Sequence, residues 1–315
     1  MLENQIMKIV KWLYLSLLTY VSMVPDSAAL DENNSITIGK ERKIFMHCEG
    51  SGSPTVLFIA GYPDRGDAGW ETPLTGKKIT VFTGVSKFTK VCDYDRPGTI
   101  KIIGDERFLK SRSDPVQQPV SAADIVDDLH QLVKAAKIHK PFIIVAHSAG
   151  GLAARLYALK YPNDVAGMIL IDVTNEKLLE AWTKKEIEVF YFGVDNSSKS
   201  LSSHYKNGEI INFKESFKQL NAYRTQKLNM PAIVLTAGKI PKASEVVKSR
   251  FWPSYVTQDM ADSIIHGIAH ANDLVADTFV PKAKRIDVKD SEHYIQKEQP
   301  ELIVQLIHSL VEQLR

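Results

Sequence analysis

The sequence has few of the residues that would indicate a metal centre or a bound cofactor. Cysteine occurs twice in 315 residues, at Cys48 and Cys92, and histidine nine times. His266 and His270 are spaced four residues apart, but no further ligand pattern accompanies them, and zinc needs three or four protein ligands. No glycine-rich nucleotide fingerprint is present either. We therefore expect neither a metal nor a cofactor.

Charge of one sign is also lacking. The chain has 39 basic and 37 acidic residues, a formal net charge of +2. Nucleic acids and membrane surfaces attract proteins largely through an excess of positive charge. We therefore expect no nucleic-acid partner and a small molecule as the ligand.

Long apolar runs are missing except near the N-terminus. Residues 12–24 form an apolar stretch of about 13 residues, whereas a membrane span needs about 20. Lys8 and Lys11 precede this stretch, and the small residues 27–29 follow it, which is the pattern of a secretory signal peptide. We expect residues 1–29 to be a signal peptide cleaved near Ala29, on a protein exported to the periplasm or secreted. The alternative is an uncleaved segment that anchors the protein to a membrane.

The remaining residues, 30–315, predict one domain of the α/β class. Hydrophobic residues make up 44% of the chain and charged residues 24%, as in ordinary soluble proteins. Short runs rich in Val and Ile alternate with helical patterns, which predicts a mostly parallel central sheet with helices on both faces. The predicted strands are residues 36–38, 42–48, 55–60, 88–94, 142–146, 166–172, 232–236 and 284–288.

Two stretches depart from this alternation. Residues 99–120 contain Pro115 and Pro119 and show no periodicity, so we expect a loop. Residues 175–229 are polar, carry aromatic residues and are mostly helical in pattern, with a break predicted at 196–200. This segment follows the carboxyl end of a predicted strand, the edge at which ligands bind in such sheets. We expect it to form a small helical cap over the site.

Ser148 lies where a buried strand gives way to a helix. The apolar run 142–146 predicts the strand, and residues 151–160 have apolar residues at helical spacing. A serine on such a turn is exposed at the sheet edge, and the pattern is the nucleophile elbow G-x-S-x-G with Ala146 at its first position. The helix N-terminus beneath it favours a developing negative charge. We therefore identify Ser148 as a candidate nucleophile.

A serine nucleophile needs a base, and the base needs a carboxylate. His293 follows the last predicted strand, and the chain order serine, acid, histidine is that of the α/β-hydrolases. An acid often follows the strand after the cap, but residues 236–241 contain none, and the first carboxylate beyond them is Glu245. Asp172 ends the strand that follows the nucleophile unit. We prefer Asp172 as the acid, with Glu245 as the alternative.

The other predicted site residues surround the serine. An oxyanion hole needs two N–H donors; we expect them from Ala149, directly after the nucleophile, and from Tyr62, in the turn after the strand 55–60. Gly61 would let the backbone approach closely there. His147 adjoins Ser148, but neighbours on a tight turn point apart, so we expect His147 in the wall of the substrate pocket.

Five segments together resemble the α/β-hydrolase superfamily of the esterase and peptidase type: Gly61-Tyr-Pro, Tyr94-Asp-Arg-Pro-Gly98, Arg112-Ser-Asp-Pro115, Ala146-His-Ser-Ala-Gly-Gly151 and Ser291-Glu-His-Tyr-Ile295. The resemblance extends from about Ile36 to Leu314, and its elbow and histidine segments are the most specific.

By this resemblance the nucleophile, base and first oxyanion donor are Ser148, His293 and Ala149. The departures are Ala146 for glycine, Ala60 for the usual histidine, and the missing acid near Gly238. Some relatives place the acid after the earlier strand, where Asp172 lies.

The resemblance also bears on the two cysteines. The strands of Cys48 and Cys92 are neighbours in the superfamily's sheet, which would allow a disulfide in an exported protein. Two buried thiols are the alternative.

The resulting functional hypothesis is a serine hydrolase that cleaves a carboxylic ester through an acyl-enzyme. One alternative is an aminopeptidase or amidase of the same fold, in which a cap glutamate would hold the substrate amine; the candidates are Glu176, Glu180, Glu186 and Glu188. Another is a non-catalytic binding protein on this scaffold, because a fold does not fix a function. A serine nucleophile excludes the aspartyl-nucleophile dehalogenases and epoxide hydrolases of the fold.

Overall fold

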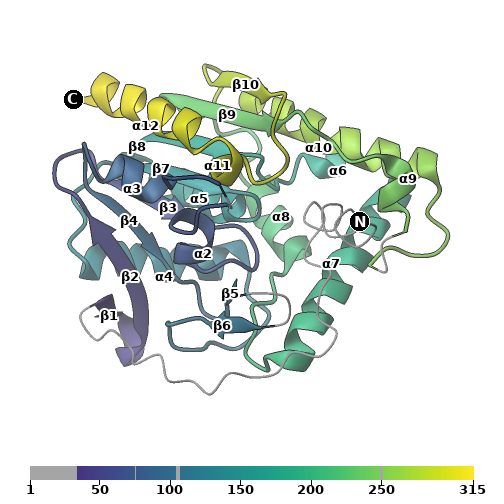
Figure 1. Ribbon diagram of the computed structural model, residues 1–315, viewed down its shortest axis with the longest axis horizontal. Helices are drawn as coiled ribbons and strands as arrows, with labels where there is room; N and C mark the ends of the chain where they lie inside the picture. Colours follow the sequence, from purple (N-terminus) through teal and green to yellow (C-terminus); the bar gives the residue numbers. More distant parts are fainter. Residues whose placement is uncertain (1–33, 75, 104–106, 249–250) are drawn as a thin grey trace.

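The computed structural model describes residues 34–74, 76–103, 107–248 and 251–315 (Figure 1). The predicted signal peptide, residues 1–29, lies outside the described residues. Across the described ranges, none of the helices combines the length and apolar character that a membrane span requires.

An eight-stranded sheet in the order β1-β2-β4-β3-β7-β8-β9-β10 forms the centre of the molecule. Strands β4, β3, β7, β8, β9 and β10 are parallel to one another, whereas β2 runs antiparallel to both of its neighbours, β1 and β4. β3 and β7 are buried along their whole length, which explains why their sequences are apolar without alternation. The predicted α/β architecture is confirmed. The strands are β1 (Ser35–Thr37), β2 (Lys43–Glu49), β3 (Val56–Ile59), β4 (Val91–Tyr94), β7 (Phe142–His147), β8 (Val165–Ile171), β9 (Ala232–Ala237) and β10 (Lys284–Val288).

Helices cover both faces of this sheet. In Figure 1, α12 crosses in front of the sheet, where it packs against α3, and α4 lies behind it, packed against α5. Ser121 begins α4 with a reciprocal pair of capping bonds to Asp124. The helices are α2 (Gly66–Trp70), α3 (Val81–Val85), α4 (Ala122–Ala135), α5 (Gly150–Lys160), α6 (Leu178–Ala181), α7 (Lys184–His204), α8 (Phe213–Asn221), α9 (Ala243–Val246), α10 (Gln258–Thr278), α11 (Ile295–Glu298) and α12 (Pro300–Leu314), with 3₁₀ turns at Gly39–Glu41 and Pro162–Asp164.

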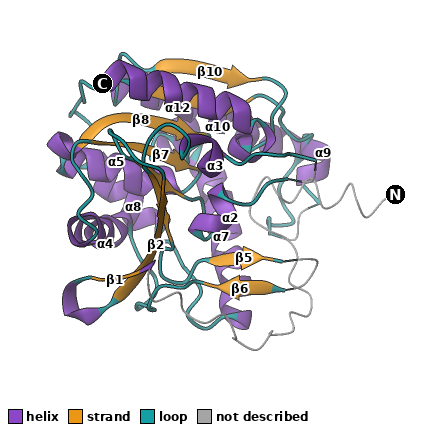
Figure 2. Cartoon of the chain, turned by 60° about the vertical axis from the view of Figure 1, so that its left-hand side comes forward, coloured by secondary structure: helices purple, strands orange, loops and turns teal. Residues whose placement is uncertain are grey.

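Two details of the sequence prediction are wrong. Residues 99–120 contain a small antiparallel hairpin, β5 (Ile100–Ile102) and β6 (Phe108–Lys110), which lies apart from the main sheet (Figure 2). Strands of three residues are too short to show a period. The break predicted at 196–200 is absent because α7 continues through it. Ser197 and Ser198 are buried, so tertiary packing overrides their weak helix propensity.

The segment 175–229 does not behave as one layer. It contains α6, α7 and α8. α6 contacts α7 and α10, whereas α8 packs against α4 and α5. The end of the segment therefore belongs to the helix layer beside the sheet, and α6 and α7 are the part that remains available as a cap.

A disulfide joins Cys48 of β2 to Cys92 of β4. The two residues are directly opposite each other in the antiparallel pair. The bond therefore cross-links the antiparallel end of the sheet to its parallel part.

Candidate active site

Ser148 occupies the sharp turn between β7 and α5. Its φ of 50° lies in the left-handed region, which non-glycine residues adopt rarely and mostly at functional sites. Two glycines make room for the turn: a Cβ on Gly61 would lie 3.1 Å from the Ser148 Cβ, and one on Gly150 would lie 2.6 Å from the Ala60 carbonyl oxygen. Ala146 is not among the described residues with positive φ, so its methyl group fits where the motif usually has glycine.

Ser148, His293 and Asp172 form a continuous hydrogen-bonded chain. The Nε2 of His293 lies 2.9 Å from the Ser148 Oγ, and its Nδ1 lies 2.6 Å from the Asp172 Oδ2. A carboxylate can only accept, so Nδ1 carries the proton and Nε2 accepts from the serine hydroxyl. This is the tautomer that a general base needs.

Asp172 follows β8 and is 2% exposed. Its second oxygen, Oδ1, accepts from the Ala237 N–H at 3.3 Å and from the Asn272 amide at 3.4 Å. Glu245, the alternative acid, lies on α9 and is not part of this hydrogen-bonded chain. The geometry thus favours Asp172.

Asn272 was missed by sequence reasoning. It is fully buried within α10 and also accepts from the Asn175 amide at 3.2 Å. The available signal was an asparagine on the apolar face of a helix, next to Ala271 and Val275. Such a buried amide requires hydrogen-bond partners.

His147 lies behind His293. It is 1% exposed, and its Nε2 donates to the His293 backbone carbonyl at 3.0 Å. Burial first, and then the nearby His293, lower the pKa of His147 well below its ordinary value. A neutral His147 therefore holds, through this hydrogen bond, the loop that carries the candidate base His293.

The turn after β3 is held by a buried ion pair. Arg96 donates to the carbonyls of Ala60 at 2.6 Å and Gly61 at 3.0 Å, and its Nε donates to Glu209 at 2.6 Å. Burial is the largest single influence and acts to lower the pKa of Arg96, but the charge and hydrogen bonds of Glu209, with the nearby Tyr94 and Asp64, together outweigh it, so the pKa is raised. Because Gly61 lies against Ser148, this pair fixes the backbone that leads into Tyr62.

Of the two predicted oxyanion donors, Ala149 directly follows Ser148, and Tyr62 follows Gly61, which lies against Ser148. Ala149 precedes the first residue of α5 with helical backbone angles, so its N–H lies at the helix N-terminus. Tyr62 follows Gly61 directly, and its side-chain hydroxyl lies 3.4 Å from the Ser198 Oγ on α7. Gly61, which precedes Tyr62, and the start of α5 therefore both lie beside Ser148.

Three of the four cap glutamates have structural partners. Glu176 forms a buried ion pair with Arg155 of α5, Glu180 pairs with Lys177 at 2.6 Å, and Glu186 caps α7 at Thr183. Glu188 is exposed on α7. None of the first three presents an unengaged carboxylate.

The mostly parallel sheet and the sharp turn at Ser148 are typical of α/β-hydrolases, and the family comparison agrees. The chain belongs to the family described as alpha/beta hydrolase fold, whose profile matches residues 84–300.

Individual relatives are distant. An uncharacterized protein, YqjL, from Bacillus subtilis is 24% identical over 262 residues, which cover 82% of this chain and 83% of that protein. Among solved structures, the N-acyl homoserine lactone degrading enzyme Est816 has a TM-score of 0.54 at 16% identity, covering 87% of this chain and 99% of that one. A thermophilic esterase from Thermogutta terrifontis has a TM-score of 0.52 at 16% identity, covering 89% and 98%. At these identities the structures establish similarity of fold.

Proposed function

We propose that this protein is a serine hydrolase that cleaves a carboxylic ester through an acyl-enzyme, with Ser148, His293 and Asp172 as its catalytic triad. The observation that carries the proposal is the unbroken hydrogen-bonded chain from the Ser148 Oγ through His293 to Asp172. Nucleophile, base and orienting carboxylate are the parts that acyl transfer requires.

In the proposed reaction, the Ser148 Oγ attacks the ester carbonyl while His293 Nε2 takes the hydroxyl proton. The carbonyl oxygen becomes an oxyanion, to which the N–H groups of Ala149 and Tyr62 donate. His293 then returns its proton to the departing alcohol, which leaves an acyl group on Ser148. A water molecule, deprotonated by His293, attacks that ester, and the acid is released as His293 returns the proton to the Ser148 Oγ. Asp172 stabilises the imidazolium in both halves.

Three of the four cap glutamates are unsuited to bind the amine of an aminopeptidase substrate, which supports an ester as the substrate; the fourth, Glu188, is exposed on α7. An aminopeptidase needs an unengaged carboxylate to bind the substrate amine, and Glu176, Glu180 and Glu186 are already bonded to Arg155, Lys177 and Thr183. Releasing Glu176 would leave Arg155 buried without its partner, which is costly.

A fluorophosphonate probe tests the nucleophile. We expect stoichiometric labelling of the wild-type protein, detected by intact mass, and none of Ser148→Ala. Ser86→Ala, which removes the hydroxyl that bonds to the Thr83 carbonyl, is a matched control that should label fully. Labelling that persists in Ser148→Ala contradicts the assignment, and a folded wild-type protein that never labels favours the binding-protein alternative.

Substrate class is tested on the same preparation. We expect turnover of p-nitrophenyl esters and acyl lactones to exceed that of amino-acid p-nitroanilides by at least tenfold in kcat/KM. A preference for the anilides would instead support the aminopeptidase alternative.

We also propose that the protein is exported. The disulfide between Cys48 and Cys92 supports this, because disulfides persist mainly in oxidising compartments, and so does the signal-peptide pattern. Protein recovered from the producing cells should have lost residues 1–29 and contain no titratable thiol after unfolding. Two free thiols and an N-terminus at Met1 would contradict the proposal.

A further inference from the structure

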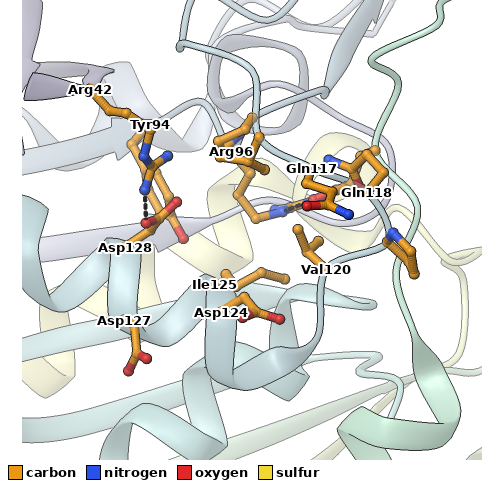
Figure 3. A pocket seen from close by; sticks show the side chains of 14 residues that line it. Arg42, Tyr94, Arg96, Gln117, Gln118, Val120, Asp124, Ile125, Asp127 and Asp128 are labelled. Carbon is orange, nitrogen blue, oxygen red and sulfur yellow. Dashed lines mark hydrogen bonds and ion pairs between the residues drawn. The ribbon is translucent and has the colours of Figure 1, made fainter. Parts of the chain in front are cut away.

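A cavity of about 470 Å³ lies between the end of β4, the N-terminal part of α4 and residues 116–120. Its volume is in the range of small-molecule sites, and Ser148 is not among the residues that line it. Figure 3 shows Arg42, Tyr94 and Asp128 on one side, Gln117 and Gln118 on the other, and Arg96 between them.

Three polar atoms in the cavity wall are buried and have no hydrogen-bond partner among the described residues: Arg42 Nη1, Tyr94 Oη and Gln118 Nε2. Tyr94 is 2% exposed, and burial raises the pKa of its hydroxyl. A buried polar group without a partner destabilises the protein. Three such groups around one cavity are available to donate to a ligand that enters it.

All three atoms can donate a hydrogen bond, so the ligand must carry acceptors. A carboxylate or phosphate ligand would meet unfavourable charge, because the cations in the wall are already paired: Arg96 with Glu209 and Arg42 with Asp128.

The ligand must also donate. Asp124 lines the cavity, and its carboxylate uses only one oxygen, Oδ2, in its bonds to Ser121. Hydroxyl groups accept and donate at the same atom, which suits a wall with both donors and a carboxylate.

We propose that this cavity is a second binding site, separate from the Ser148 centre, for a neutral polyhydroxylated small molecule such as a monosaccharide or a cyclitol. Tyr94, Gln118 and Arg42 donate to ligand oxygens, and Asp124 accepts from a ligand hydroxyl group. Pro97, Val116 and Ile125 provide the apolar part of the wall.

Ligand-observed NMR and calorimetry with D-glucose and myo-inositol test the proposal. The Ser148→Ala protein is used alongside the wild type, so that neither turnover nor the catalytic serine contributes. We expect saturable binding that is equal in the two proteins. Tyr94→Phe removes one hydroxyl and should weaken binding about three- to tenfold, the effect of one lost hydrogen bond. Tyr255→Phe, at a tyrosine that is 50% exposed, is the matched control and should leave binding unchanged.

A second variant protects the test against a folding defect in Tyr94→Phe. Gln118→Glu keeps an oxygen for the Ile210 N–H, which donates to Gln118 Oε1 at 2.8 Å, but removes the unpartnered NH₂ group. We expect it also to weaken binding. The proposal is overturned if neither polyol binds, if Ser148→Ala abolishes binding, if both wall variants bind like wild type, or if acetate binds in preference to the polyols. Arg96 and Glu209 are left intact because they hold the turn beside Ser148.

Discussion

Two aspartates in this protein are equally hidden from solvent but have opposite surroundings. Asp172 is 2% exposed, and its oxygens accept from His293, Ala237 and Asn272. Asp93, in β4, is 0% exposed, and its carboxyl group faces the carboxyl group of Glu71 instead of an N–H donor.

The difference shows that donors, more than burial, decide what a hidden carboxyl group can do. Burial, followed by the negative charges of Glu71 and Asp95, raises the pKa of Asp93 well above its ordinary value, so Asp93 retains its proton. The donors around Asp172 suit a carboxylate. We infer that only Asp172 can stabilise a protonated histidine.

Asp172→Asn should have the largest effect. The amide would present its NH₂ group to His293 and favour the wrong tautomer, so we expect kcat for an ester to fall about 10⁴-fold with little loss of stability. Steady-state kinetics and thermal melting measure the two quantities. Near-wild-type kcat would instead move the acid role to Glu245, which Glu245→Gln would then reveal.

Arg96 extends the comparison to a buried cation, one whose partners are two carbonyls and a carboxylate. Arg96→Lys keeps the charge but cannot make all four hydrogen bonds of the guanidinium, two of which go to Glu209. The turn before Tyr62 should shift, and we expect kcat to fall about tenfold to a hundredfold with a smaller change in KM.

Arg155→Lys is the matched control for that effect, because Arg155 is also buried, 2% exposed against 3% for Arg96, and is paired with a glutamate, Glu176. It should lower the melting temperature without a comparable loss of kcat. Equal losses of kcat in the two variants would show that neither arginine acts through the turn.

Asn272→Ala should have a smaller effect. It removes the more distant donor of Asp172, at 3.4 Å, but leaves the Ala237 N–H in place. We expect kcat to fall up to about tenfold, in line with the loss of one hydrogen bond to a charged group. Asn272→Asp, which places a second negative charge beside Asp172, should be worse than Asn272→Ala; the reverse order would mean that Asn272 acts only through packing.

The elements and residues that could be predicted share a local signal. The buried strands 142–146 and 166–172 have apolar runs, and Ser148 and His293 follow strands in a fixed chain order. Asp172 was preferred over Glu245 by its position at a strand end.

The residues that could not be predicted depend on contacts distant in sequence. Asn272 bonds to Asp172, 100 residues away in the sequence, and Glu209 bonds to Arg96, 113 residues away. No local sequence pattern predicts such pairs. His147 was expected in the pocket wall because neighbours on a turn diverge, but its role depends on the His293 carbonyl, which only the folded chain brings near.

Asp93→Asn should leave activity unchanged and alter only stability. Folded Asp93 holds its proton to a higher pH than unfolded Asp93, whose ordinary pKa is 3.8. From about pH 3.8 up to the raised pKa, the folded state therefore binds more protons, and rising pH lowers the free energy of unfolding. Asparagine cannot ionise, so the variant should match the wild type below pH 3.8 and become the more stable of the two as pH rises. Urea unfolding of both proteins between pH 3.5 and pH 8.5 measures the difference. A variant that loses stability at high pH would show that Asp93 is needed as a carboxylate, and the contrast with Asp172 would then fail.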